Sequence, residues 1–207
     1  NIGNGIMPIA LAFGVLDLPG ATPTSLSIVL AAQAVPLVIM LPIGGVVADR
    51  LGRAKVIAVN LSGAFYGTQA AARAMVAAGK GGRIINIASQ AAKSAFPHLP
   101  AYVSSKHGMV GLTRASAMEL GAHRITVNAV CPNHVTTGLG AQQNEYFSRL
   151  LGFATVEDYI ADMHRKNPMG RPGLATDTAA TCAWLASDEA FYMTGEALNV
   201  SGGEEMH

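Results

Sequence analysis

The sequence predicts an α/β fold, a parallel sheet with flanking helices, preceded by one or two hydrophobic helices of transmembrane type. Two observations predict it. From residue 59 onward, short apolar runs alternate with longer helical patterns, as in chains that form parallel sheets. Residues 1–48, in contrast, contain Asp17 as their one charged residue and no lysine or arginine. We therefore divide the chain into a hydrophobic segment, residues 1–59, and an α/β segment, residues 60–207.

The overall composition excludes some functions. The chain of 207 residues carries 14 Lys and Arg against 13 Asp and Glu, so no basic nucleic-acid surface is expected. The six histidines show no ligand spacing, and no metal site is predicted. Cys131 and Cys182 stand in apolar surroundings, which favours two buried free thiols. Because the chain begins with Asn1, we expect a fragment or a processed product.

Residues 24–48 form an uncharged run of 25 residues, long enough to cross a bilayer as a helix. Pro36 and Pro42 disfavour a soluble helix but are tolerated in membrane bundles. Residues 2–18 are a shorter apolar run that would be the remainder of a preceding span. The alternative for residues 24–48 is a buried helix of a soluble protein that ends in a charged turn.

Residues 45–55 resemble the loop between the second and third helices of major facilitator superfamily transporters. The positions that fit are Gly45, Asp49, Arg50, Gly52, Arg53 and Lys55. The resemblance implies a transporter fragment at about residues 1–59, with this loop on the cytoplasmic side and membrane association through residues 1–48. One and a half spans are present where such transporters have about a dozen, so transport by this chain alone is not expected.

The first elements of the α/β segment are a helix and a strand. Residues 61–78 place Phe65, Ala72 and Met75 on one helical face, and Gly79 follows as a C-cap. Residues 83–89, with the sequence RIINIAS, form a nearly continuous apolar run. Such a run predicts a strand that is buried on both faces of a parallel sheet.

The same alternation continues to the end of the chain. Residues 102–120 predict a helix closed by Gly121, and residues 124–131 predict a strand stopped by Pro132. Two further elements follow: a helix from a capping Thr176 to Leu185, and a strand at 197–200 before Gly202 and Gly203.

Tyr102, Lys106 and Ser89 are the residues that indicate chemistry. A phenol and an amine four residues apart share one face of a helix, so the ammonium is expected to hold the phenol partly deprotonated. A serine hydroxyl at the end of the preceding strand could polarise a carbonyl between them. A tyrosine and a lysine at this spacing also occur by chance on solvated helices, so the pair alone is weak.

From about residue 60 to residue 204 the chain resembles the C-terminal half of the short-chain dehydrogenase/reductase family. The matching pieces, in order, are residues 59–63, the strand ending in Ser89, the Tyr102–Lys106 pair, residues 124–132, residues 186–189 and residues 194–195. The resemblance implies a partial Rossmann-like sheet and an oxidoreductase that uses NAD or NADP on a small-molecule alcohol or ketone.

The family's catalytic positions fall on Asn60, Ser89, Tyr102 and Lys106. The resemblance implies that Tyr102 is the general acid/base, Ser89 binds the substrate oxygen, Lys106 holds the nicotinamide ribose, and Asn60 anchors a water. The implied cofactor-binding residues are Tyr102, Lys106, Pro132, Asn133, Val135 and Thr137. Asn133 stands where the family usually has glycine, and asparagine tolerates a left-handed backbone better than most residues.

Residues 138–172 would form the substrate lid. The expected apolar lining is Tyr146, Phe147, Leu150, Leu151 and Phe153. The polar residues Gln142, Gln143 and Asn144 favour a polyol or sugar-like substrate. Ser201 stands where the family commonly has aspartate.

The glycine-rich turn that binds a dinucleotide pyrophosphate in this family has no counterpart in the sequence. We therefore expect impaired activity, a bare apolar edge at the strand 83–89 and a join between two genes near residues 56–60. The alternative function is a membrane-associated, transporter-derived fragment or an inactive fusion. Self-association through helices 61–78 and 102–120 is expected. The location would be cytoplasmic for the dehydrogenase part, or the membrane if residues 1–48 insert.

Overall fold

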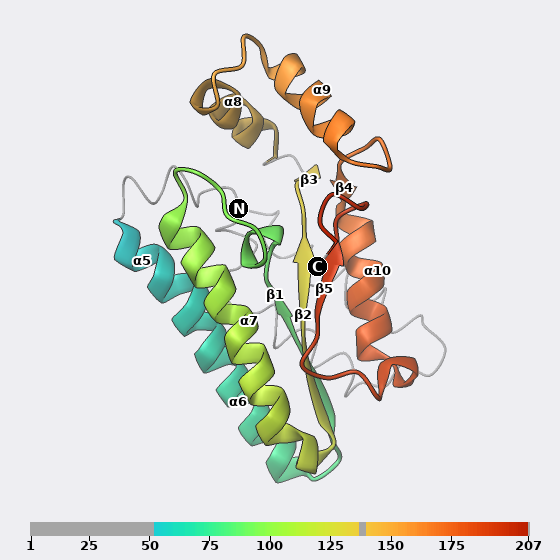
Figure 1. The fold of residues 1–207 in the computed structure, drawn as a ribbon. Helices are drawn as coiled ribbons and strands as arrows, with labels where there is room; N and C mark the ends of the chain where they lie inside the picture. Colours follow the sequence, from blue (N-terminus) through green and yellow to red (C-terminus); the bar gives the residue numbers. More distant parts are fainter. Residues whose placement is uncertain (1–51, 137–139, 207) are drawn as a thin grey trace, which may run out of the picture.

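A computed structural model describes residues 52–136 and 140–206. Their central feature is a parallel sheet of three strands in the order β1 (Gly82–Ile87), β2 (Ile125–Pro132) and β5 (Ala197–Val200). Helices α6 (Gly63–Ala78) and α7 (Pro100–Leu120) cover one face, and α10 (Ala175–Ala186) covers the other (Figure 1). The predicted parallel sheet with flanking helices is confirmed.

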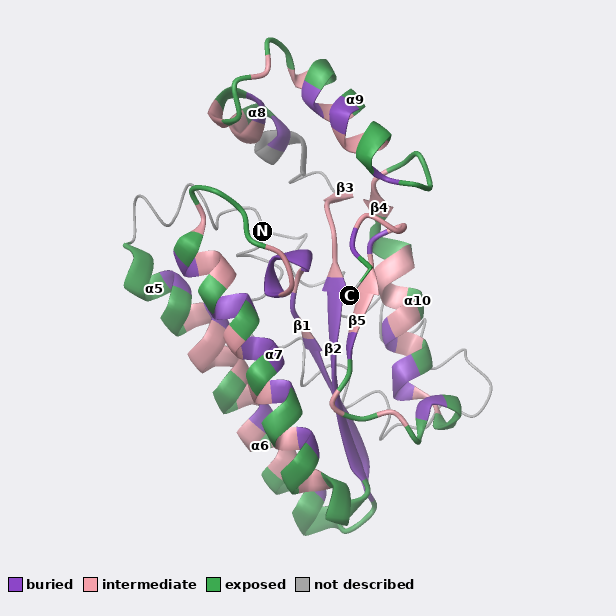
Figure 2. Cartoon of the chain, in the orientation of Figure 1, coloured by how far each residue is buried: buried purple, intermediate pink, exposed green. Residues whose placement is uncertain are grey.

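The alternation of side chains along β2 explains why both faces are covered. Ile125, Val127 and Ala129 belong to the two apolar clusters under α6 and α7, whereas Val130 joins the cluster under α10. All residues from Ile125 to Cys131 are buried, and Figure 2 shows most of β1 and β2 as buried and most of β5 as intermediate. Since both faces are buried, β2 is mostly apolar, with Thr126 and Asn128 as its buried polar residues.

The helix before β1 is longer than the sequence predicts. A short helix α5 (Arg53–Ile57), a π-helical turn (Ala58–Ser62) and α6 follow one another without a break. Residues 53–59, which belong to the predicted hydrophobic segment, are therefore helical, and this helix continues into the α/β segment. Gly79 ends it in the left-handed conformation (φ 64°), as predicted from its C-cap position.

One predicted helix end is confirmed and one predicted cap is corrected. Helix α7 ends at Leu120 with Gly121 as its C-cap residue, as predicted, and the chain continues through a 3₁₀ turn (Gly121–His123) to Arg124, which is left-handed (φ 58°). At α10 the N-terminal cap is formed by Asp177, which accepts a hydrogen bond from Leu174 N at 2.8 Å, and not by Thr176. A carboxylate in the first turn satisfies a free helical N–H and also suits the helix dipole.

The lid region forms two helices above the C-terminal ends of the strands (Figure 1). These are α8 (Gly140–Leu150) and α9 (Val156–Lys166). Two-residue strands β3 (Val135–Thr136) and β4 (Gly173–Leu174) pair in parallel where the chain enters and leaves the lid. Short 3₁₀ helices lie at Gln90–Ala92 and Asp188–Ala190.

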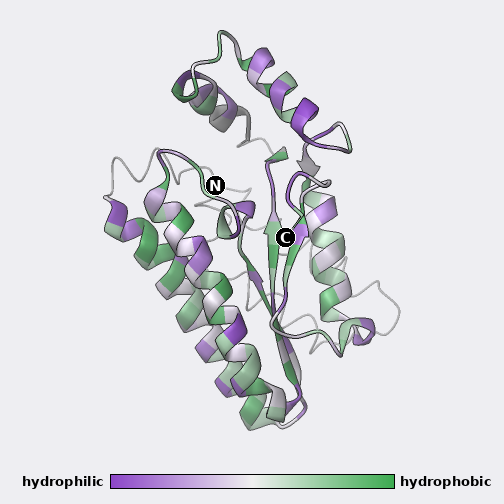
Figure 3. Ribbon diagram, in the orientation of Figure 1, coloured by the Kyte–Doolittle hydropathy of each residue, from purple (hydrophilic) through white to green (hydrophobic). Residues whose placement is uncertain are grey.

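The predicted hydrophobic segment falls almost entirely outside the described residues. Residues 1–51 include the uncharged run 24–48 and most of the loop that resembles a transporter. Within the described ranges, no helix is both long enough and apolar enough to span a membrane. Apolar and polar residues alternate around the described helices in Figure 3. β1 is the outer strand of the described sheet, but its side chains Ile84 and Ile85 are buried against the two helical layers.

Candidate active site

Three of the four predicted catalytic residues meet at the C-terminal end of β1. Ser89 follows this strand after one residue, and Tyr102 and Lys106 lie on the first turns of α7. The Ser89 hydroxyl is a hydrogen-bond partner of the Tyr102 phenol. The Nζ of Lys106 lies 5.8 Å from the centroid of the Tyr102 ring. Tyr102 and Lys106 thus form one cluster with Ser89, although they follow it by 13 and 17 positions in the sequence.

Ser89 is held in place by the backbone that follows it. It has an extended conformation (φ −176°, ψ 161°) and caps the 3₁₀ helix Gln90–Ala92. Its Oγ accepts a hydrogen bond from Ala91 N at 3.1 Å. This contact uses one lone pair of the oxygen and leaves the hydroxyl proton free to bind another acceptor.

Lys106 is a buried lysine, with 1% of its surface exposed. Its Nζ donates a hydrogen bond to Ile87 O at 3.0 Å. Burial lowers the pKa of this amine to about 7, although the nearby Cys131 opposes the shift. An ammonium has three donors, so the group can bind further acceptors such as the hydroxyls of a ribose. The donor chemistry present therefore fits the nicotinamide ribose.

The protonation state of Tyr102 differs from the sequence-based expectation. Burial raises the pKa of the phenol to about 12, Ser89 lowers it by hydrogen bonding, and Cys131 raises it further. The lowering expected from Lys106 is absent because this amine donates to Ile87 O instead. Burial also lowers the pKa of Lys106 to about 7, so this amine loses its charge as the pH rises through neutrality. The phenol in this structure is a proton donor at neutral pH.

Asn60 approaches the cluster from the π-helical turn. Its Nδ2 donates to Ser105 Oγ at 3.1 Å, and Ser105 Oγ donates to Tyr102 O at 2.7 Å. Single-turn π-helices inside α-helices occur frequently at functional sites. The structure therefore connects Asn60 to the backbone of Tyr102, through a residue that the sequence analysis did not single out.

Both cysteines are buried and free, as predicted. Cys131 lies at the end of β2 beside Ser89, and burial raises the pKa of its thiol. Burial likewise raises the pKa of Cys182, on α10, to about 12. Among the described residues, no group of three or more His, Cys, Asp or Glu side chains is arranged to hold a metal ion.

The predicted cofactor loop begins where β2 ends. Pro132 pairs with Val200, and Val135 pairs with Gly173. Asn133 is not left-handed, so the turn does not need the freedom of the glycine expected there. Its side chain donates to Ser201 O at 3.1 Å and to Glu204 Oε2 at 2.9 Å. Thr137, the remaining predicted cofactor contact, lies outside the described residues.

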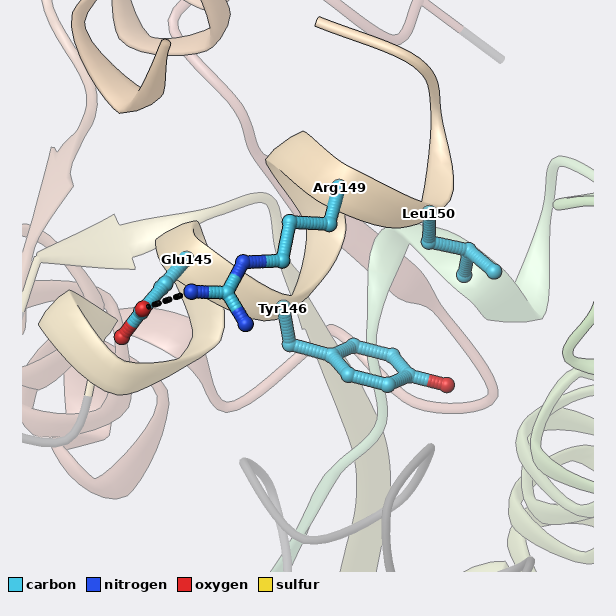
Figure 4. Close-up of a pocket in the computed structure, with 4 residues that line it drawn as sticks. All are labelled: Glu145, Tyr146, Arg149 and Leu150. Carbon is cyan, nitrogen blue, oxygen red and sulfur yellow. Dashed lines mark hydrogen bonds and ion pairs between the residues drawn. The ribbon is translucent and has the colours of Figure 1, made fainter.

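A surface pocket lies at α8, lined by Glu145, Tyr146, Arg149 and Leu150 (Figure 4). Arg149 forms an ion pair with Glu145 at 2.5 Å, one turn apart on the same helix. Tyr146 and Leu150 were both expected in the apolar lining of the lid. Neither Ser89, Tyr102 nor Lys106 lines this pocket, so we locate the chemistry by the side-chain cluster instead.

Comparison with known proteins gives a consistent family. The family model described as enoyl-(acyl carrier protein) reductase matches residues 44–205. The match includes all of residues 45–55, so these need no transporter fragment to account for them. The predicted fusion to a transporter is not supported.

Relatives of known activity and solved structures cover about three quarters of the chain. The (3R)-3-hydroxyacyl-CoA dehydrogenase of Rattus norvegicus is 41% identical over 149 residues, 72% of this chain and 53% of its own length. A sorbitol-6-phosphate 2-dehydrogenase from Erwinia amylovora is 31% identical with a TM-score of 0.72, covering 75% of this chain and 60% of that one. An actinorhodin polyketide ketoreductase with NADPH is 37% identical with a TM-score of 0.69, over 73% and 58%. The chain thus spans about half the length of the curated relatives it matches.

Proposed function

Since the chain belongs to the short-chain dehydrogenase/reductase family, we propose that it contributes the catalytic half of an NAD(P)-dependent oxidoreductase acting on a secondary alcohol or its ketone. The observation that carries the proposal is the contact between the Ser89 hydroxyl and the Tyr102 phenol, with Lys106 Nζ 5.8 Å from the ring. This arrangement suits proton transfer to an oxygen atom at a site without metal.

In the proposed reduction, Tyr102 is the general acid. A phenol whose pKa is raised to about 12 keeps its proton at neutral pH and can donate it to a carbonyl oxygen as negative charge develops there. Ser89 donates a hydrogen bond to the same oxygen, because its hydroxyl is adjacent to the phenol. The reverse reaction needs the phenolate, and therefore a positive charge near the ring.

Lys106 would hold the cofactor through the hydroxyls of its ribose. Its amine has donors to spare beyond Ile87 O, and ribose hydroxyls are suitable acceptors. Pro132, Asn133 and Val135 would border the nicotinamide, with Thr137 beyond them. A bound nicotinamide supplies the hydride and, in its oxidised form, a positive charge. Binding of acceptors to Nζ would also favour the charged lysine, which in turn lowers the pKa of Tyr102.

Asn60 is proposed to support the site through Ser105. Its contact with Ser105 and the contact of Ser105 with Tyr102 O connect the π-helical turn to the helix that carries the phenol. A water bound near Asn60 would relay the proton outward.

The substrate class follows from the relatives' names and from the lid. The three relatives compared above are named as a (3R)-3-hydroxyacyl-CoA dehydrogenase, a sorbitol-6-phosphate 2-dehydrogenase and a polyketide ketoreductase. These names share the interconversion of a hydroxyl and a keto group. The polar residues Gln142, Gln143 and Asn144 at the start of the lid support a polar, hydroxylated substrate.

The test is turnover by the longest natural protein that contains this sequence. We expect NADPH or NADH oxidation with a diketone such as diacetyl, and a loss of about 10²–10⁴-fold in Tyr102→Phe, because the acid is removed while the ring remains. Tyr192→Phe is the matched control, since 97% of Tyr192 is exposed. Equal rates in the wild type and Tyr102→Phe would refute the assignment.

We also propose self-association through α6 and α7. These helices expose large apolar side chains, with Phe65 45% exposed, Tyr66 65% and Met118 86%. Light scattering of the purified protein tests this, and a monomer at micromolar concentration would exclude it.

A further inference from the structure

The residues after β5, Ser201–Glu205, form a closed turn that we call the C-terminal turn. Ser201 Oγ donates to Glu205 O at 3.1 Å and accepts from Glu205 N at 3.2 Å. Gly202 and Gly203 have positive φ angles of 62° and 89°. Ser201 is 4% exposed and Glu205 is 7% exposed. The serine that replaces the family's aspartate therefore has a structural role, because its hydroxyl closes this turn.

The C-terminal turn binds the loop that follows β2. Asn133 Nδ2 donates to Glu204 Oε2 at 2.9 Å and to Ser201 O at 3.1 Å. Both amide hydrogens are therefore used, which settles the orientation of the side-chain amide. The hydrogen bond to the carboxylate is charge-assisted and is the stronger of the two types.

Two other segments of the active-site region end on the same turn. Asn167, where α9 leaves the lid, donates from Nδ2 to Ser201 O at 2.9 Å. Ser94, between Ser89 and the start of α7, donates its hydroxyl to the Glu205 carboxylate. The turn therefore contacts three segments that are far apart in the sequence. These are residues 89–99, which we call the serine loop, the loop after β2, and the end of the lid at Asn167.

Asn133 fits because its neighbour has no side chain. A Cβ on Gly173 would lie 2.8 Å from Asn133 Oδ1. Gly173 N in turn donates to His134 O at 3.0 Å. A glycine at position 133 would have neither contact with the C-terminal turn, so the loop would rely on its backbone bonds alone.

We propose that Glu204 is a positioning residue, which holds residues 133–136 in place through Asn133. The C-terminal turn thereby couples the loop that borders the proposed nicotinamide site to the serine loop and the lid. This proposal rests on the proposed function in one respect, which is that the ligand beside residues 133–136 is a nicotinamide. The loop's rigidity can be measured without any ligand.

Amide hydrogen exchange of the cofactor-free chain, followed by NMR, tests the proposal. The reporters are the amides of Asn133 and Gly173, which donate to Val200 O at 3.3 Å and His134 O at 3.0 Å. In Glu204→Ala we expect both to exchange about ten-fold faster or more, the factor that follows from the loss of a charge-assisted hydrogen bond. Glu204→Gln keeps an acceptor for Asn133 and should restore most of the protection. Glu196→Ala, at an exposed glutamate, is the matched control and should change neither amide.

Unchanged exchange in Glu204→Ala, or equal loss of protection in the alanine and glutamine variants, would overturn the proposal. If Glu204→Ala does not fold, Asn133→Ala removes the other end of the same bond and must show the same loss at Gly173. In a protein that turns over, Glu204→Ala should raise the cofactor KM more than it lowers kcat. Absence of turnover would count against the proposed function and leave the exchange result standing.

Discussion

Lys106 makes the stability of the cofactor-free protein depend on pH, and its replacement by methionine should remove that dependence. Methionine has a similar length but no charge. Burial lowers the pKa of this lysine from 10.5 to about 7. Below pH 7 the folded state must carry a buried ammonium, and the cost to folding is fully present. Between pH 7 and 10.5 the folded state has released the proton while the unfolded chain retains it, so the free energy of unfolding rises with pH.

The magnitude follows from the same shift. The cost of charging the folded state reaches roughly 3–5 kcal/mol below pH 7, and it falls by about 2–3 kcal/mol between pH 6 and pH 9. Lys106 is 1% exposed, so solvent screens little of this. The Lys106→Met variant also loses the hydrogen bond to Ile87 O, but that loss is independent of pH. The difference between wild type and variant across pH therefore isolates the charge.

The assay is urea unfolding followed by circular dichroism at pH 6, 7, 8 and 9, with linear extrapolation to water. We expect the stability of the wild type relative to Lys106→Met to rise by about 2–3 kcal/mol over this range. Lys80→Met, at an exposed lysine, is the control and should follow the wild type at every pH. A constant difference between wild type and Lys106→Met would show that the lysine keeps its charge in the folded protein, and would refute the reasoning.

Three further predictions concern packing and polar contacts. Thr113→Val should destabilise the fold by about 1–3 kcal/mol in urea unfolding, because Asn86 Nδ2 loses its acceptor at 3.0 Å inside the core; Thr113→Ser, which keeps the hydroxyl, should lose clearly less. Leu185→Ala removes a fully buried side chain of α10 and should cost about 2–5 kcal/mol, and a change below about 1 kcal/mol would show that the site collapses around the cavity. The pKa of Asp177 is lowered to about 2 by Arg171 and Leu174 N. The stability that the charged carboxylate contributes to the fold is therefore present above pH 4 and is lost as the pH falls toward 2. Asp177→Asn should melt below wild type at pH 7, with the gap closing toward pH 3, and a gap independent of pH would exclude the charge as its cause.

Local patterns in the sequence predicted the α/β framework well. The strand at 197–200 and the buried strands near 83–89 and 124–131 are found as expected, because a strand buried on both faces must be apolar almost throughout. Gly79 ends its helix as predicted, since glycine adopts the left-handed conformation without strain. The predicted cap at Thr176 is wrong because the helix begins one residue before Thr176, at Ala175, and the side chain that accepts from Leu174 N is therefore that of Asp177.

The relation of Tyr102 to Lys106 is the main point on which spacing misled. Four residues on a helix do bring the two side chains to one face. The spacing carries no information on burial or on competing acceptors, and these decide the charge. Burial leaves the phenol with a raised pKa and the amine with a lowered one, while the amine donates its hydrogen bond to Ile87 O.

The order of residues by itself determined the strands and helices, the family to which the chain belongs and the identity of the Ser89, Tyr102 and Lys106 cluster. These depend on side-chain periodicity and on motifs that span a few residues each. Only the tertiary structure decided that Asn60 reaches Tyr102 through Ser105, and that Glu204 holds Asn133. Such contacts join residues 45 and 71 positions apart, and no local pattern specifies which polar groups meet once the sheet has brought the strand ends together.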